Sequence, residues 1–137
     1  MPVDQGNPMD SIEVSASLPG TPERLFAAWI DAAQHAEMTE APATSEPVVG
    51  GAFTAWDGYI SGTHLELEAP RRLVQAWRAS DFPEGAPDSR LEVRFAAVHG
   101  GTVVTVVHSG LPPGTGPNYA RGWEEYYFEP MRSWLRG

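Results

Sequence analysis

The stretch ARGWEEYYFEPMRSWL, residues 120–135, decides how the rest of the chain has to be arranged. Its apolar side chains recur at intervals of three, four, four and three residues, at Ala120, Trp123, Tyr127, Met131 and Trp134. Such intervals put side chains on one face of an α-helix. We therefore predict a long amphipathic C-terminal helix, kinked at Pro130, because proline cannot donate a hydrogen bond to the Tyr126 carbonyl.

The segments before this helix alternate polar and apolar residues, which is typical of strands with one buried face. Asp57-Gly58 and Gly100-Gly101 lie between such segments and favour tight hairpin turns. Gly50-Gly51 indicates a bulge or a close backbone approach. The predicted strands are residues 11–18, 52–56, 59–68, 73–80, 91–98 and 102–108. Their short connections favour an antiparallel meander.

Two short helices are expected between the first two strands. Thr21 can cap the first helix and Pro22 suits its first turn. Asp31 can cap a second helix that continues to Met38. Residues 39–47 have the composition of a loop.

The order of these elements predicts an α+β fold. A curved antiparallel sheet of about six strands would wrap around the long C-terminal helix, with the two short helices closing one end. The chain of 137 residues has the length of one domain. We expect that domain over residues 11–137, after a flexible leader at residues 1–10.

The composition excludes several classes of function. The chain has a net charge of −9, contains no cysteine, and uses arginine for all 9 basic residues. Nucleic-acid binding needs basic side chains against phosphates, while disulfides and thiol chemistry need cysteine. The N-terminus lacks a signal-peptide pattern and no apolar run has the length of a membrane span. We therefore expect a soluble, cytoplasmic protein with no nucleic-acid or membrane partner.

No metal or other cofactor is expected. His35, His64 and His99 have no partner at the spacing of metal ligands, and a His-Glu-x-x-His motif is missing. The sequence also has no Gly-x-Ser-x-Gly elbow and no glycine-rich phosphate loop between a strand and a helix. Hydrolases, kinases and dehydrogenases of the common types therefore lack their site.

Five segments of the chain are distinctive, namely WDGYISG (56–62), PRRLVQAWR (70–78), GTVV (101–104), HSGLP (108–112) and GWEEYYFE (122–129). They resemble the family of activators of the heat-shock protein 90 (Hsp90) ATPase. The resemblance spans about residues 12–135 and implies the helix-grip fold, also called START-like, SRPBCC or Bet v-like. Eukaryotic members add an N-terminal domain that binds the chaperone, and only their C-terminal module matches here. The resemblance implies a chaperone partner and a place in the stress response, while the wider superfamily mostly encloses an apolar ligand cavity.

Aromatic and apolar side chains on facing elements form the first candidate site. A helix gripped by a strongly curved sheet often leaves a void, which would be an apolar ligand pocket. The same pattern also fits a filled core, and both interpretations stay open. The predicted ligand-binding residues are Phe26, Trp29, Phe53, Trp77, Phe95, Val104, Val106, His108, Trp123, Tyr127 and Met131.

His108 is the polar member of this set. It shares the inward face of the last strand with Val104 and Val106. An imidazole there can orient a ligand carbonyl or act as a base near neutral pH. It can equally be a hydrogen-bonded structural residue.

Three hypotheses for the function follow. The leading one is non-enzymatic binding of a small hydrophobic molecule between the sheet and the C-terminal helix. The second is a co-chaperone that activates the ATPase of an Hsp90 homologue. The third is a cyclase or dehydratase for a polyketide-like substrate, with His108 as the base. The sequence is compatible with a monomer and with a homodimer.

The other charged side chains are expected outside the core. Glu66, Glu68 and Glu92 alternate with apolar neighbours and should face solvent. A strip with cross-strand ion pairs is predicted for Arg78, Arg90 and Arg94. The hairpin tip at residues 56–59 is expected to fold an aromatic side chain inward over the sheet, although it could also contact a protein.

Overall fold

Seven strands and a helical layer make up residues 9–136, the part of the chain that this computed structural model describes. The strands are β1 (Asp10–Leu18), β2 (Thr44–Ser45), β3 (Ala52–Ala55), β4 (Ile60–Glu68), β5 (Arg72–Ala79), β6 (Ser89–Val98) and β7 (Gly101–Leu111). They form one antiparallel sheet in the order β1-β7-β6-β5-β4-β3-β2. The predicted α+β architecture with an antiparallel meander is confirmed.

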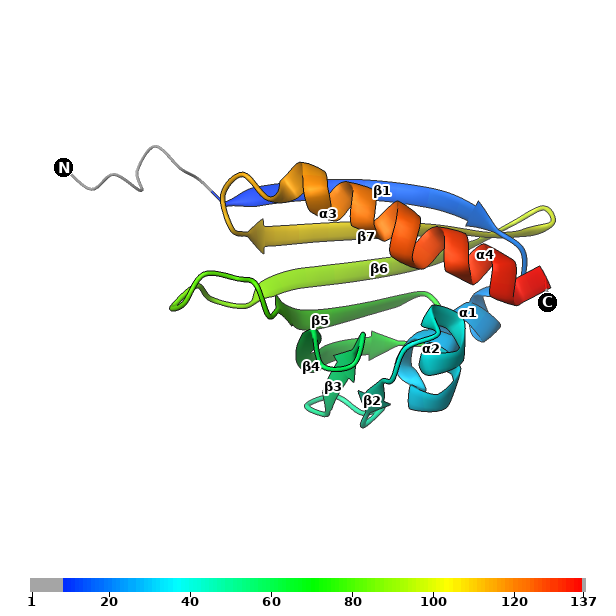
Figure 1. Ribbon diagram of the computed structural model, residues 1–137. Coiled ribbons are helices and arrows are strands. Elements are labelled where there is room, and N and C mark those ends of the chain that lie inside the picture. Colours follow the sequence, from blue (N-terminus) through cyan, green and yellow to red (C-terminus); the bar gives the residue numbers. More distant parts are fainter. Residues whose placement is uncertain (1–8, 137) are drawn as a thin grey trace.

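The helices lie against this sheet (Figure 1). They are α1 (Pro22–Ile30), α2 (Ala32–Thr39), α3 (Gly116–Trp123), a π-helical turn η2 (Glu124–Phe128) and α4 (Glu129–Arg136). The last three form one continuous C-terminal helix along the sheet. The short helices α1 and α2 lie near α4, at the C-terminal end of that helix. None of the helices within residues 9–136 combines the length and apolarity needed to cross a membrane.

The number of strands and the start of the first strand differ from the prediction, and the other strand ends differ by at most three residues. The sheet has seven strands rather than six, because β2 lies in the segment predicted as a loop and pairs with Thr54 and Phe53. A strand of two residues is too short to show alternation in the sequence. Asp10, which was assigned to the leader, is the first residue of β1. Residues 1–8 of that leader lie outside the described residues.

Side chains cap the starts of the helices. Thr21 and Asp31 each accept a hydrogen bond from the backbone N–H three residues further on, at 3.1 and 2.9 Å, as predicted. The first turn of α3 is capped by a different element, because Asp10 Oδ2 accepts a bond from the Gly116 N–H at 2.7 Å. β1 therefore fixes where the C-terminal helix begins.

The π turn lies directly before Pro130. In it the Glu129 N–H donates to the Glu124 carbonyl, five residues back. Proline has no N–H to continue an α-helical ladder and crowds the carbonyl of the preceding turn, so a wider turn accommodates it. The structure thus has a π turn just before Pro130, where the sequence predicted a kink.

The inner face of the sheet carries the hydrophobic core. Phe95 on β6 lies opposite Val104 on β7, and both are buried. From α1, Phe26 and Trp29 meet the Phe95 ring edge-on, with ring centroids 5.8 and 6.2 Å apart. Such edge-on aromatic contacts add to the stability gained from burial. The end of the sheet covered by α1 is therefore tightly filled.

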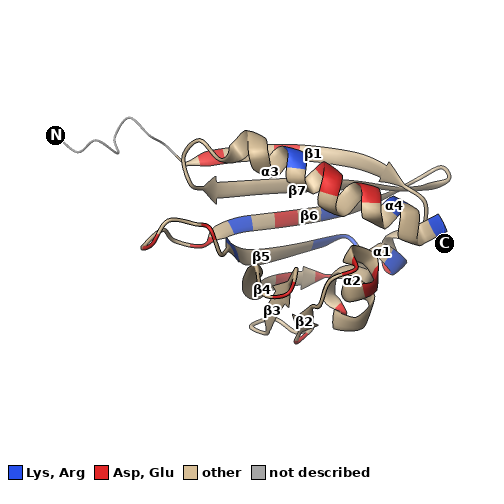
Figure 2. Cartoon of the chain, in the orientation of Figure 1, with Lys and Arg blue, Asp and Glu red and all other residues tan. Residues whose placement is uncertain are grey.

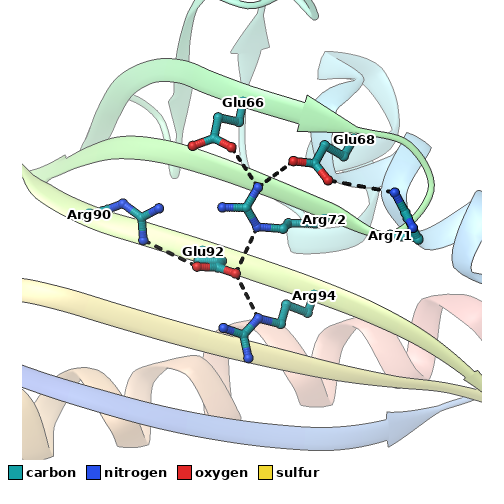
Figure 3. A network of polar contacts seen from close by, with 7 residues as sticks. All are labelled: Glu66, Glu68, Arg71, Arg72, Arg90, Glu92 and Arg94. Carbon is teal, nitrogen blue, oxygen red and sulfur yellow. Dashed lines mark hydrogen bonds and ion pairs between the residues drawn. The ribbon is translucent and has the colours of Figure 1, made fainter.

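The outer face of the sheet carries a network of ion pairs around Glu92 (Figure 3). This carboxylate accepts hydrogen bonds from Arg72 at 3.0 Å, Arg94 at 2.8 Å and Arg90 at 3.3 Å. Glu92 lies on the outer face of the sheet as predicted, but the three arginines cover it and leave its side chain 10% exposed. Their hydrogen bonds, that of Arg94 foremost, lower the pKa of Glu92 to about 2.

Arg72 links this network across the strands. It also contacts Glu66 and Glu68, at 2.7 and 2.6 Å, and both of these carboxylates are exposed as predicted. Arg78 lies apart from the network and pairs with Asp88 at 3.4 Å. Figure 2 shows basic and acidic positions alternating on β6 and only basic positions on β5, so this face carries charge of both signs.

Candidate functional site

A cavity of about 680 Å³ lies beside the first half of the C-terminal helix and opens to solvent. The β3–β4 turn, the end of β5 and the loops after β5 and β7 form its other walls. Its lining residues are Trp56, Tyr59, Ile60, Trp77, Asp81, Phe82, Pro83, Pro112, Pro113, Thr115, Asn118, Tyr119, Gly122, Trp123, Tyr126 and Tyr127. Eight of these side chains are aromatic, and Asp81 is the only one of the lining residues that carries a formal charge.

Aromatic rings in contact with one another form the inner wall of this cavity. The ring of Trp123 lies 5.9 Å from that of Trp77 and 4.7 Å from that of Tyr127. Behind them Trp29 stacks on Tyr127 at 5.3 Å and on Trp123 at 6.0 Å. Trp29 belongs to α1, so the cavity ends where the short helices begin to fill the space.

Two tyrosines and one aspartate meet at the cavity wall. Tyr59 and Tyr119 donate their hydroxyl hydrogens to the two oxygens of Asp81, at 3.0 and 3.1 Å. Burial, and then the nearby Asp81 carboxylate, raise the pKa of Tyr119, and the same two causes raise the pKa of Tyr59. Both phenols therefore remain protonated donors at neutral pH.

His108 lies behind the inner wall and is fully buried. The Trp123 indole N–H donates to His108 Nδ1 at 3.1 Å, so Nε2 carries the imidazole proton. Nε2 donates to Ser89 Oγ at 2.8 Å, and Ser89 in turn donates to the Trp77 carbonyl at 2.7 Å. Burial lowers the pKa of His108 to about 3. With both nitrogens engaged, the imidazole positions Trp123 and has no free nitrogen to serve as a base.

A second buried histidine holds Tyr127. The carbonyl of Trp29 can only accept, so His35 Nδ1 donates to it at 2.9 Å. His35 Nε2 is then the acceptor for the Tyr127 hydroxyl, at 3.1 Å. Burial lowers the pKa of His35 and raises that of Tyr127, so both groups are neutral. The spacing of His35 three and four residues before the buried Met38 and Thr39 was the signal for its inward position.

His64 is the third buried imidazole and lies away from the cavity. It contacts Ser45 Oγ at 3.0 Å and the Gln75 amide nitrogen at 3.4 Å, and it stacks on Phe53 at 5.2 Å. Burial lowers its pKa as well. Within residues 9–136, His, Asp and Glu side chains nowhere gather in a group of three that could hold a metal ion.

Comparison with known proteins decides the family. The family model described as "Activator of Hsp90 ATPase homolog 1-like protein" matches residues 19–136, which include every element that lines the cavity. The chain belongs to this family. The resemblance found in the sequence is thereby confirmed.

Individual proteins and solved structures that are similar to this chain support the same family and fold. The human "Activator of 90 kDa heat shock protein ATPase homolog 1" is 29% identical over 131 residues, which cover 96% of this chain and 38% of the human protein. The crystal structure of an HSP90 activator from Plasmodium falciparum superposes with a TM-score of 0.83 at 25% identity, covering 92% of this chain and 96% of that one. The Aha1 dimer from Colwellia psychrerythraea shares the fold, with a TM-score of 0.78 at 16% identity over 93% of this chain and 96% of that one. The predicted helix-grip fold is confirmed.

In this Hsp90-activator-like domain, three of the eleven predicted ligand-binding residues line the main cavity: Trp77, Trp123 and Tyr127. Trp29 and Phe53 border a separate void of about 10 Å³, which has room for one water molecule at most. The other six are packed in the core, namely Phe26, Phe95, Val104, Val106, His108 and Met131. Under α1 the core is filled, so inward-facing residues there have no space beside them.

Five aromatic lining residues were missing from the predicted site, namely Trp56, Tyr59, Phe82, Tyr119 and Tyr126. On the helix, Tyr119, Gly122 and Tyr126 lie three and four residues apart, so they share a face next to the predicted apolar stripe. This spacing could have identified them. The half-buried Trp56 folds inward as expected for the hairpin tip and meets Tyr126 edge-on at 5.9 Å.

Proposed function

We propose that this domain binds a small, largely apolar molecule in the aromatic cavity. The observation that carries the proposal is a cavity of about 680 Å³ with eight aromatic lining residues. Sites for small molecules typically measure roughly 300–1,000 Å³ and are mostly apolar with a few placed polar groups. The cavity has both properties.

The walls of the cavity are held in place before any ligand arrives. His108 fixes the Trp123 indole and His35 fixes the Tyr127 hydroxyl, each through a buried hydrogen bond. Ligand binding therefore costs little conformational entropy at these side chains, because they are already ordered. It also removes aromatic surface from water, which contributes roughly 25 cal/mol for each Å² of apolar area buried.

Gly122 offers a direct way to fill the cavity. It lies in α3, lines the cavity, and a Cβ at this position would have only Tyr126 within 4 Å, at 3.8 Å. A Gly122→Leu variant places a branched side chain in the cavity and also replaces a weak helix former. A Gly122→Ala variant shares the change in helix propensity but adds one carbon, so it is the matched control.

The test is calorimetric titration of 2-naphthylmethanol, a neutral apolar probe, into the three proteins. We expect measurable binding to the wild type and to Gly122→Ala, and at least about tenfold weaker binding to Gly122→Leu. Equal binding to all three folded proteins, or binding to none, would contradict the proposal.

A second proposed function is activation of the ATPase of an Hsp90 homologue. Membership of the Hsp90-activator-like family and similarity to the human activator favour it. The chain spans 38% of the human protein, so the activity of that whole protein is a proposal for this chain.

Steady-state ATPase rates of the Hsp90 homologue from the same organism test this function. A rise in rate that saturates with added protein would support activation. An unchanged rate at a large molar excess would exclude it. Repeating the assay with Gly122→Leu would show whether activation depends on the cavity or on another surface.

A further inference from the structure

We propose that the cavity selects positively charged aromatic ligands, of the primary-amine class, over neutral and anionic ligands of the same shape. The inference rests on the proposed ligand-binding function and names the chemistry of the ligand. Asp81 is its main determinant.

The electrostatics of the lining residues favour a cation. Asp81 is the only one of the sixteen with a formal charge, and that charge is negative. Aromatic rings present negative faces, and eight of them surround the same space. The net charge of −9 on the whole chain adds a long-range field of the same sign.

Four of the hydrogen-bond donors at the cavity wall are already used within the protein. Tyr59 and Tyr119 donate to Asp81, and Thr115 donates to the Pro112 carbonyl at 2.6 Å. The Trp123 indole donates to His108. A ligand carboxylate would therefore enter the cavity without these four partners, and each missing hydrogen bond makes burial of its charge more costly.

Acceptor capacity, in contrast, remains at the cavity wall. An ionised carboxylate offers about four lone-pair sites, and the two tyrosines occupy two of those on Asp81. An ammonium group has three donors and no acceptor, so it complements what is left. The two phenols also fix the direction of the carboxylate.

The nearest arginines do not neutralise this arrangement. Arg78 is bound to Asp88 and to the Ala86 carbonyl, and Arg121 is bound to Asn118 Oδ1 at 2.8 Å. Neither arginine is among the lining residues. Arg78 does cover the ring of Phe82, 5.6 Å from its centroid, so it occupies one of the eight aromatic faces, but it does not pair with Asp81.

Three probes of nearly equal shape separate charge from fit: 2-naphthylmethylamine, 2-naphthylmethanol and 2-naphthoate. Each is titrated calorimetrically at neutral pH into the wild type, Asp81→Asn and the control Glu84→Gln. Glu84 lies in the same loop, is exposed and does not line the cavity. The control thus removes the same charge from the loop without changing the wall.

We expect the wild type and Glu84→Gln to bind the amine about tenfold more tightly than the alcohol, and the naphthoate most weakly. Asp81→Asn should lose the preference, so that the amine and the alcohol bind this variant with about equal affinity. An amine that binds no better than the alcohol, or a preference that survives in Asp81→Asn, would overturn the proposal while the binding function stands. Failure of all three probes to bind the folded wild type would overturn both.

Discussion

The space between the C-terminal helix and the sheet is filled with side chains at one end and contains a cavity at the other. At the end covered by α1, Phe26 and Trp29 reach Phe95 and the space is filled. At the other end, Tyr119 and Trp123 contact Trp77, with ring centroids 5.6 and 5.9 Å apart, and a cavity of about 680 Å³ opens beside these rings. The same kinds of side chain line both ends. The covering helix, rather than aromatic content, therefore decides whether a pocket forms.

Each end also has its own buried histidine. His35 holds Tyr127 at the filled end, and His108 holds Trp123 at the open end. The two imidazoles support the single aromatic wall that separates the ends. The wall of the cavity is thus held by hydrogen bonds from both ends. Substitutions at the filled end and at the open end can each test whether the two ends differ in packing.

Removing a large side chain from the filled end should have the largest effect on the free energy of unfolding. Trp29→Ala removes the ring that stacks on Trp123 and Tyr127, and should lower the free energy of unfolding by about 3–5 kcal/mol. Urea unfolding measures this loss. Trp56→Ala, at the half-buried edge of the open end, is the comparison and should cost less than half as much. Similar losses in the two variants would mean that the ends do not differ in packing.

Lowering the pH should reduce the free energy of unfolding through the buried histidines that support the aromatic wall. The pKa of His108 is lowered to about 3, so in the native state it stays neutral while the unfolded chain takes up a proton below about pH 6.5. The unfolded state then binds more protons, so the free energy of unfolding falls as the pH drops from 6.5 towards 3.

A His108→Gln variant isolates this contribution, because glutamine keeps a donor and an acceptor but does not titrate. Between pH 7 and pH 4.5 its free energy of unfolding should fall by about 2–3 kcal/mol less than that of the wild type. Parallel pH profiles from urea unfolding would show that His108 does not titrate on unfolding.

Closing the open end should change stability only slightly. Gly122→Leu improves helix propensity and buries a side chain where space exists, so it should raise the free energy of unfolding by about 0.5–1 kcal/mol. Thermal unfolding beside Gly122→Ala measures the difference. A marked loss of stability in Gly122→Leu alone would show that the space is already occupied.

Trimming the outer rim should have the smallest effect. Tyr126 is 58% exposed although it lines the cavity. Tyr126→Ala should change the free energy of unfolding by less than about 0.5 kcal/mol, as surface substitutions usually do. It should nevertheless weaken binding of 2-naphthylmethanol. A large loss of stability would place Tyr126 in the core instead of on a ligand surface.

The sequence was sufficient for the fold because periodicity encodes which face is buried. Alternation located the strands, the caps at Thr21 and Asp31 located α1 and α2, and the stripe through Trp123 located the C-terminal helix. The two-residue strand at Thr44–Ser45 is too short for any periodicity to reveal.

The site was only partly predictable. Trp77 and Trp123 were identified because inward-facing positions follow from the pattern. Whether an inward-facing ring meets another ring or empty space depends on which helix covers it, and the sequence does not state that. The meeting of Tyr59, Asp81 and Tyr119 depends on a turn, a loop and a helix that are brought together only by the fold.

The most direct test of a cavity confined to one end uses the five tryptophan indoles as reporters. Three of them, Trp56, Trp77 and Trp123, line the cavity. The other two do not: Trp29 lies behind the wall and Trp134 donates its N–H to Glu37 at 3.1 Å. In a ¹⁵N-resolved NMR titration with 2-naphthylmethanol, the indole signals of the three lining tryptophans should shift with one common saturation curve. The Trp29 signal should shift less than any of these three, and the Trp134 signal should not shift. Shifts led by Trp29 or Trp134, or no indole shift at saturating probe, would contradict the account.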